Sequence, residues 1–314
     1  MINQFTCAAF GANTGTDECS FDPGKILGFF LVGPSFAISE ADTASDETLL
    51  AKLQLATLET LKANRLFPVH GLLDVADNSA EAAQQTFGYG AVVNTNNGTY
   101  NWSFPFIKGG ICLLKALQQF NGADIRPIFY DDNNTLIGWK SGAFLKGIPL
   151  IQFFAPKWNI ATGAAVTGKN VTFSFDPKYI NQQLGFYKFS DEVSMDSVEG
   201  LRNIKLYQSG TQAKPVYKVK ASAGCSNVDL YTQYSSVLAA AGLWVAKNKA
   251  TGALITVTSV AVDANISGWT VTLDSADADY PAVGTIELSL TTPNLLKAAG
   301  VVGYESLILN IVNV

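Results

Sequence analysis

Strand-like and helix-like apolar patterns alternate along the first half of the chain. An apolar run over residues 25–32, closed by Gly33-Pro34, predicts a buried strand. Leucines recur at helical spacing after Ser45, which can cap a helix, and this pattern predicts a helix over 45–64. A second, shorter amphipathic helix is predicted over 111–120.

The clearest local signal predicts a long β-hairpin over residues 86–106. Two extended runs flank Thr95-Asn96-Asn97-Gly98, and Asn-Gly is the dipeptide most typical of a tight hairpin turn. In the second arm large aromatic residues alternate with small or polar ones, so we expect one face of this strand to be buried. The aromatic positions are Tyr100, Trp102, Phe104 and Phe106, and the intervening ones are Asn101, Ser103 and Pro105.

Further strand patterns complete an α+β first domain. A second hairpin is predicted over 125–140, around Asp131-Asp132-Asn133-Asn134. After residue 190 acidic side chains cluster with few large apolar residues between them. We therefore expect a first domain over residues 1–207, with a β-sandwich or barrel core and two helices. Its later strands are predicted over 148–155, 171–175 and 204–207.

The remaining chain predicts a separate all-β domain. We expect a linker over 208–214 and a domain over 215–314, in which turn signals recur every 8–12 residues or so, as in an immunoglobulin-like sandwich. A helix over 227–240 is predicted as an insertion. The predicted strands cover 216–220, 243–246, 254–262, 269–273, 285–290 and 307–312. The fold class expected for the whole chain is mainly β.

The amino-acid composition indicates a surface with few charged side chains. The chain has 314 residues, which favours two domains, and only 15% of them are charged, against roughly 25% in an ordinary soluble protein. Asn, Thr, Ser, Gly and Gln supply the polar cover instead. Charged residues are depleted at the cores of protein interfaces, so this composition favours a protein that assembles with others. A plain β-sandwich protein of low charge remains the alternative.

The charge distribution argues against binding to nucleic acid. The apolar pattern argues against a membrane span and a secretory signal. The formal net charge is −5 and no Lys/Arg cluster stands out, so DNA that passed the protein would meet a neutral to acidic wall. No secretory signal and no stretch of 18 apolar residues is present, which predicts a soluble protein made in the cytoplasm. Four scattered cysteines, expected to be free thiols, are Cys7, Cys19, Cys112 and Cys225.

Few residues indicate a catalytic, metal-binding or cofactor-binding site. The single histidine, His70, has no second imidazole for a metal and no nucleophile motif beside it. Asp131-Asp132-Asn133-Asn134 lacks the ligand spacing of a calcium loop and is typical of a turn. Gly88 and Gly90 lie within a strand-like run, where they indicate a bulge or close backbone approach and not a phosphate loop. We expect no catalytic, cofactor-binding or metal site, and no enzyme.

The aromatic face of the long hairpin has two possible functions. Tyr100, Trp102, Phe104 and Phe106 could stack on sugars or bases. No basic residues surround them, so core packing or contact between subunits is favoured.

With these elements in place, residues 25–207 resemble the tail-tube proteins of long-tailed bacteriophages: an early helix, a very long hairpin around Asn97-Gly98, a short second helix and further strands. Phe67-Pro68, Thr86-Phe87-Gly88-Tyr89-Gly90 and Phe129-Tyr130-Asp131 also resemble virion proteins of phages that infect Bacteroidota. The resemblance implies a virion subunit that joins its sheet to those of neighbours in a ring of six and reaches the next ring with hairpins. Such proteins often carry an outer immunoglobulin-like domain, which here would be 215–314.

The function expected from the resemblance is therefore structural. The partners would be copies of the same chain and other virion proteins, with DNA only as passing cargo and no membrane. A capsid or capsid-decoration protein is the first alternative, and a carbohydrate-binding or adhesion module is the second.

Overall fold

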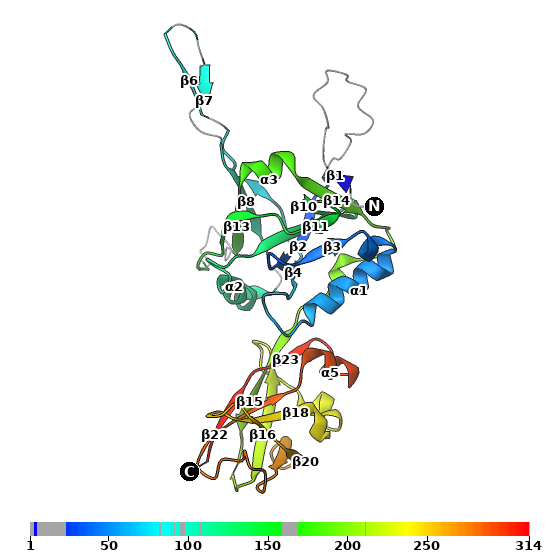
Figure 1. Cartoon of the computed structure of the whole chain (residues 1–314), viewed down its shortest axis with the longest axis vertical. Coiled ribbons are helices and arrows are strands. Elements are labelled where there is room, and N and C mark those ends of the chain that lie inside the picture. Colours follow the sequence, from blue (N-terminus) through cyan, green and yellow to red (C-terminus); the bar gives the residue numbers. More distant parts are fainter. Residues whose placement is uncertain are drawn as a thin grey trace, which may run out of the picture. The chain divides into compact units, whose positions relative to one another are not determined.

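A computed structural model of the chain describes residues 3–4, 23–81, 83–88, 90, 92–94, 98–106, 109–158, 169–210 and 212–313 (Figure 1). Strands make up 43% and helices 17%, in several antiparallel sheets that include two half-barrels, so the mainly β prediction is confirmed. The chain divides into two compact units. Unit 1 comprises Met1–Thr57 and Leu61–Glu199, and unit 2 comprises Leu58–Thr60 and Gly200–Val314.

An eight-stranded sheet forms the centre of unit 1. Its order is β1-β14-β10-β9-β2-β4, with β11 paired to β10 and β3 paired to β11. Phe29, Phe30, Leu31 and Val32 of β2 are fully buried, because other layers cover both faces of this strand. The strands are β1 (Asn3–Gln4), β2 (Ile26–Val32), β3 (Ala37–Ser39), β4 (Phe67–His70), β9 (Arg126–Asp131), β10 (Thr135–Ser141), β11 (Phe144–Lys146) and β14 (Leu184–Lys188).

A four-stranded sheet packs on one face of this large sheet, in the order β12-β13-β8-β5. Aromatic rings fill the space between the two sheets, with Phe29 and Phe173 5.0 Å apart and Phe104 and Phe129 5.4 Å apart. Helix α2 contributes Leu114 to the same core. The elements are β5 (Ala76–Asp77), β8 (Tyr100–Pro105), β12 (Leu150–Phe154), β13 (Asn170–Phe175) and α2 (Gly110–Gln118).

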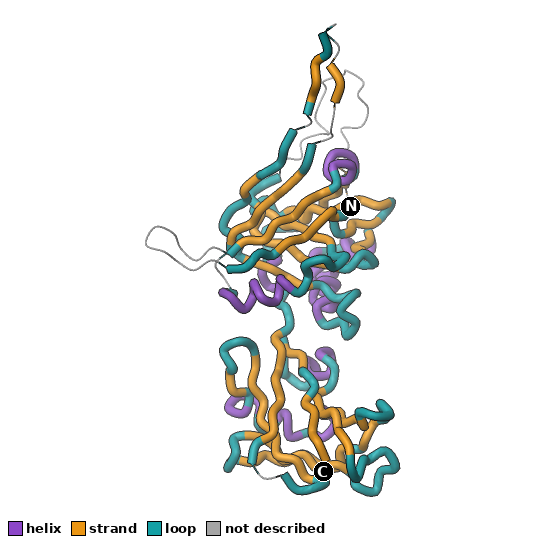
Figure 2. The backbone as a smooth tube through the Cα atoms, turned by 90° about the vertical axis from the view of Figure 1, so that its left-hand side faces the viewer, coloured by secondary structure: helices purple, strands orange, loops and turns teal. Residues whose placement is uncertain are grey.

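Helix α1 (Asp46–Thr57) covers the opposite face of the large sheet, where Leu49 and Leu53 pack with Phe30. Unit 1 is thus layered as small sheet, large sheet and helix (Figure 2). The predicted helix over 45–64 is too long, because the chain turns after Thr57 and the Leu66 N–H donates to the Ala56 carbonyl. The remaining helical elements of unit 1 are η1 (Ala41–Thr43), α3 (Pro177–Gln182) and η2 (Met195–Ser197).

A long hairpin exists, but the predicted bounds of 86–106 and the predicted turn are both wrong. Strands β6 (Gln84–Thr86) and β7 (Val92–Asn94) pair with Thr86 opposite Val92, so the chain reverses between these two residues. Ala80 pairs with Thr99 and Asp77 with Trp102, so the same two arms continue down to β5 and β8. Residues 95–97 of the expected turn lie outside the described residues. The hairpin extends away from the body of unit 1 (Figures 1 and 2).

Unit 2 is a sandwich of two sheets around one core. The larger sheet has the order β20-β21-β16-β15-β23, with β17 paired to β16, and the smaller one has the order β19-β18-β22-β24. Trp269 is fully buried between the sheets, 6.2 Å from Trp244. The strands are β15 (Arg202–Gln208), β16 (Val216–Ala223), β17 (Val228–Asp229), β18 (Trp244–Asn248), β19 (Leu254–Ile255), β20 (Val257–Asp263), β21 (Gly268–Leu273), β22 (Gly284–Leu290), β23 (Tyr304–Ser306) and β24 (Leu309–Asn313).

Two boundaries in this part of the chain differ from the prediction. The domain boundary lies between residues 199 and 200, not after 207, because β15 pairs with β16 and β23 of unit 2. The described residues of 208–210 and 212–214 therefore belong to unit 2, where the Ser209 N–H donates to the Lys218 carbonyl. The predicted helix over 227–240 is replaced by short pieces. These are β17, α4 (Tyr231–Tyr234) and η3 (Val237–Ala239), followed by η4 (Ala241–Leu243), while α5 (Pro293–Ala298) was not predicted.

The expected redox state of two cysteines is also wrong. Cys112 and Cys225 both take part in disulfide bonds. Cys7 and Cys19 lie outside the described residues.

Candidate functional site

The aromatic face of β8 belongs to the core of unit 1. Phe104 and Phe106 are buried, and the half-buried Trp102 packs 4.7 Å from Phe175 and 5.8 Å from Phe129, measured between ring centroids. The prediction that one face of this strand is buried is confirmed. These rings are therefore occupied by packing and do not form an open surface for sugars or bases.

Both edges of the four-stranded sheet expose apolar side chains. Strand β12 forms one edge, where Ile151 and Phe154 are 68% and 47% exposed, and it contains no charged residue. At the other edge, just before β5, Leu73 and Val75 are 45% and 39% exposed. Soluble proteins commonly protect such edges with charges or covering segments. Among the described residues, β12 pairs only with β13, and β5 pairs only with β8.

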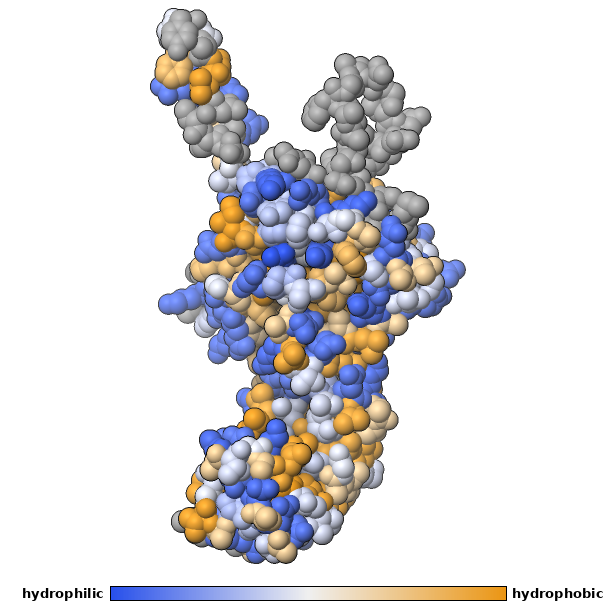
Figure 3. Space-filling view, viewed as in Figure 1, coloured by the Kyte–Doolittle hydropathy of each residue, from blue (hydrophilic) through white to orange (hydrophobic). Residues whose placement is uncertain are grey.

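The far end of the long hairpin is also apolar. Phe87, Val92 and Val93 are exposed there, and Figure 3 shows hydrophobic side chains near this end. Gly90, at φ +84°, forms part of the turn and donates its N–H to the Phe87 carbonyl at 2.8 Å. The glycines noted in the sequence, Gly88 and Gly90, therefore belong to a hairpin end and not to a strand-to-helix phosphate loop.

His70 lies in a chain of hydrogen bonds at the end of β4. Its Nε2 is 2.8 Å from the Val198 carbonyl and therefore donates to it, while its Nδ1 is 2.6 Å from the Tyr130 hydroxyl. Tyr130 donates to Asp196 Oδ1 at 2.7 Å. The arrangement ties the last segment of unit 1 to strands β4 and β9, which is a structural role, and no side chain in the group is poised as a nucleophile.

Tyr130 remains protonated in this chain. Burial raises the pKa of its phenol, and the hydrogen bond to Asp196 and the charge of that carboxylate raise it further. The ring also stacks on Phe30 at 5.4 Å. The hydroxyl therefore donates to Asp196 and also lies within hydrogen-bond distance of His70 Nδ1, so it joins two side chains that are distant in sequence.

Replacing Tyr130 with phenylalanine is expected to lower the free energy of unfolding of unit 1 by about 1–3 kcal/mol, because both hydrogen bonds are lost and one of them joins the hydroxyl to a charged carboxylate. Urea unfolding followed by circular dichroism measures the change. Tyr207→Phe, at an exposed tyrosine of unit 2, is the control and should change stability by less than about 0.5 kcal/mol. Equal effects of the two substitutions would contradict this account of His70 and Tyr130.

The acidic turn at Asp131-Asp132-Asn133-Asn134 closes the β9–β10 hairpin. Asp131 Oδ1 accepts from the Thr135 N–H at 2.8 Å, and Asp131 Oδ2 accepts from the Gly24 N–H at 2.8 Å. Asn134 has φ +59°, a conformation that asparagine tolerates well. The carboxylates thus bond backbone groups, as in a turn. Within the described ranges, no three His, Cys, Asp or Glu residues gather where they could hold a metal ion.

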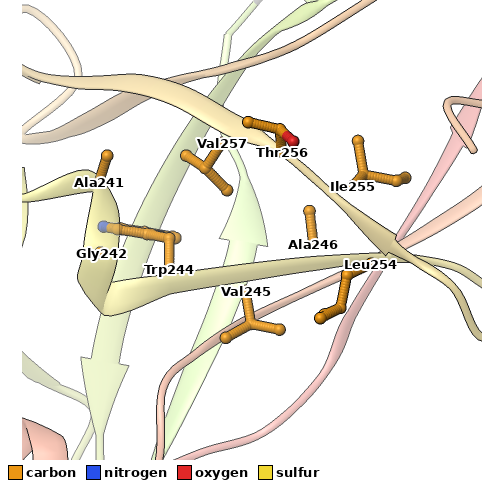
Figure 4. A pocket seen from close by; sticks show the side chains of 9 residues that line it. All are labelled: Ala241, Gly242, Trp244, Val245, Ala246, Leu254, Ile255, Thr256 and Val257. Atoms are coloured by element: carbon orange, nitrogen blue, oxygen red, sulfur yellow. The ribbon is translucent and has the colours of Figure 1, made fainter. Parts of the chain in front are cut away.

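A shallow apolar cleft of about 380 Å³ lies on unit 2, lined by residues of η4, β18, β19 and β20. Figure 4 shows Trp244, Ala246 and Val257 around it, and none of its nine lining residues is titratable. The lining therefore offers no titratable acid or base.

Comparisons with known proteins identify no relative of this chain. No protein-family model, no curated protein and no solved structure matches the chain. Of the helices that the structure describes, none is long and apolar enough to cross a membrane.

Proposed function

We propose that the chain is a self-assembling structural subunit of a phage virion, made in the host cytoplasm, which forms the stacked rings of a tail tube. The observation that carries the proposal is the four-stranded sheet of unit 1: among the described residues both of its edges lack a strand partner, and both expose apolar side chains, with Asp74 and Asp77 also exposed at the β5 edge. The tail tube is the member of this class that the resemblance of residues 25–207 favours.

The two edges of the sheet are compatible with one another. All three pairings within it are antiparallel, so β12 and β5 run in opposite directions. If β12 of one copy lies beside β5 of the next, the joined sheet continues the same antiparallel pattern. The contact joins two different surfaces of the subunit. Copies joined in this way form a closed ring when the rotation from one copy to the next is a whole fraction of a full turn.

Burial of the edge side chains would stabilise this contact. Ile151 and Phe154 meet water in the isolated chain, as do Leu73 and Val75 at the opposite edge. Covering apolar surface contributes about 25 cal/mol per Å² removed from water, and strand pairing satisfies the open backbone groups as well. The small proportion of charged residues in the whole chain agrees with extensive contact between proteins.

The long hairpin supports stacking of the rings. It continues β5 and β8 beyond the body of unit 1, and it ends in the exposed Phe87, Val92 and Val93 (Figure 1). A two-stranded hairpin has no core of its own and is marginally stable in water. Contact with a copy in the next ring would cover its apolar end.

Negative-stain electron microscopy of the purified chain tests the proposed function. We expect rings or tubes, together with a sedimentation coefficient far above that of one copy. A chain that remains a stable monomer at micromolar concentrations would contradict the proposal.

A further inference from the structure

The outer face of the four-stranded sheet carries no charge. Side chains alternate along its strands, so the neighbours of the buried Phe104, Phe173 and Phe175 point away from the core. We call these outward residues the uncharged face. They are Ala76, Asn101, Ser103, Pro105, Gln152, Phe154, Asn170, Thr172 and Ser174, of which Ser103 is buried and Phe154 is exposed.

Hydrogen bonding within this face is between neutral groups. The Asn170 amide donates to the Ser103 hydroxyl at 3.1 Å, across the β8–β13 pair. A solvated sheet face of unit 2 differs, since Lys247 lies opposite Glu287 there. Asp77, the acidic residue of β5, lies opposite Trp102 and thus belongs to the other side of the sheet. The absence of charge is therefore a property of this one face.

We infer that the uncharged face lines the central channel of the ring and is the surface past which double-stranded DNA moves; the inference rests on the proposed function. The other face of the sheet packs on the large sheet, and α1 lies behind that. When sheets join edge to edge into a closed ring, the bulky layers must lie outside, because they do not fit within the circle. The uncharged face is then the inner surface.

A neutral inner surface suits a polyanion that must pass without being held. DNA binds proteins chiefly because Lys and Arg neutralise phosphates and release counterions, and the side chains of this face include neither. They contain no carboxylate that would repel the phosphates either. Hydroxyl and amide groups keep water at the surface, so the DNA would slide on a hydrated wall.

Lysines placed on this face should convert it into a DNA-binding surface. The test is the double variant Thr172→Lys, Ser174→Lys on the interior strand β13, where the edges stay unchanged. Its matched control is Thr285→Lys, Ser289→Lys on β22, an interior strand of unit 2 with two outward, half-buried positions. The probe is a linear double-stranded DNA fragment, mixed with assembled particles and sedimented with them at low salt.

We expect particles of the first variant to retain at least about tenfold more DNA than the control, and to release it as salt is raised, because the added cations repeat around the channel. Equal retention by the two variants would overturn the inference. Loss of assembly in the Thr172→Lys, Ser174→Lys variant alone would also overturn it, since the face would then be a contact between proteins. Failure of the unmodified chain to assemble would instead remove the proposed function, and this inference with it.

Discussion

Replacing Phe173 with alanine is expected to lower the free energy of unfolding of unit 1 by about 3–5 kcal/mol, among the largest effects of any single substitution in this chain. The Phe173 side chain is fully buried between the two sheets. Its ring centroid lies 5.0 Å from that of Phe29, 5.2 Å from Phe153 and 5.5 Å from Phe129. Truncation therefore removes apolar burial and ring contacts together, and it leaves a cavity that close-packed neighbours fill only in part.

The matched control for Phe173 is the Phe154→Ala substitution on the adjacent strand β12. Phe154 is 47% exposed, so its loss should cost under about 1 kcal/mol in the monomer. Urea unfolding with circular dichroism measures both variants. A similar cost for the two would mean that the sheets do not pack as described.

The second large effect is expected at the open edge. The double substitution Ile151→Lys, Phe154→Lys should abolish assembly while leaving the monomer folded, because both side chains are exposed in the single chain. In a ring the charge added at position 151, on the edge strand itself, would be buried beside a neighbouring copy without a partner, which costs several kcal/mol at every contact. Each 1.4 kcal/mol weakens one contact tenfold, and a closed ring repeats the loss.

Sedimentation velocity measures this change. The control is Leu254→Lys, at an equally exposed leucine of unit 2, which should assemble like the unmodified chain. Rings that persist in the Ile151→Lys, Phe154→Lys variant would show that β12 is not a contact surface.

The hairpin illustrates how far local sequence signals reach. Alternating aromatics correctly predict the buried side of β8, because strand periodicity is local. The turn was misplaced because Asn97-Gly98 is a strong local signal, whereas pairing with the rest of the sheet fixes the register of the arms. Pairing of β8 with β13 joins residues about 70 positions apart, which no short-range pattern encodes.

The predictions of several helices and of the domain boundary are wrong for related reasons. The Asp176-Pro177 and Thr292-Pro293 pairs are typical of helix starts, and they begin α3 and α5. Residues 227–240 consist mostly of weak helix formers such as Val, Tyr, Ser and Thr, and they form β17, α4 and η3 in place of one helix. The sequence of β15 is typical of a strand and would fit either domain. Its pairing with β16 and β23 assigns it to unit 2.

The candidate surfaces were only partly predictable. The sequence indicates low charge and a hairpin but not which strands form sheet edges, because an edge is defined by the absence of a neighbour. His70, Tyr130 and Asp196 are separated by 60 and 66 positions, so their hydrogen-bond chain has no local signature.

Covalent linking of the two sheet edges tests the central claim most directly. Val75→Cys and Ile151→Cys, combined in one chain and treated with a short bis-maleimide, should give a ladder of linked copies on a reducing denaturing gel. The ladder should end at the number of copies in the ring. Each single substitution and the unmodified chain, which contains four cysteines of its own, serve as controls. A doubly substituted chain that runs as a single copy, like its controls, would contradict the account.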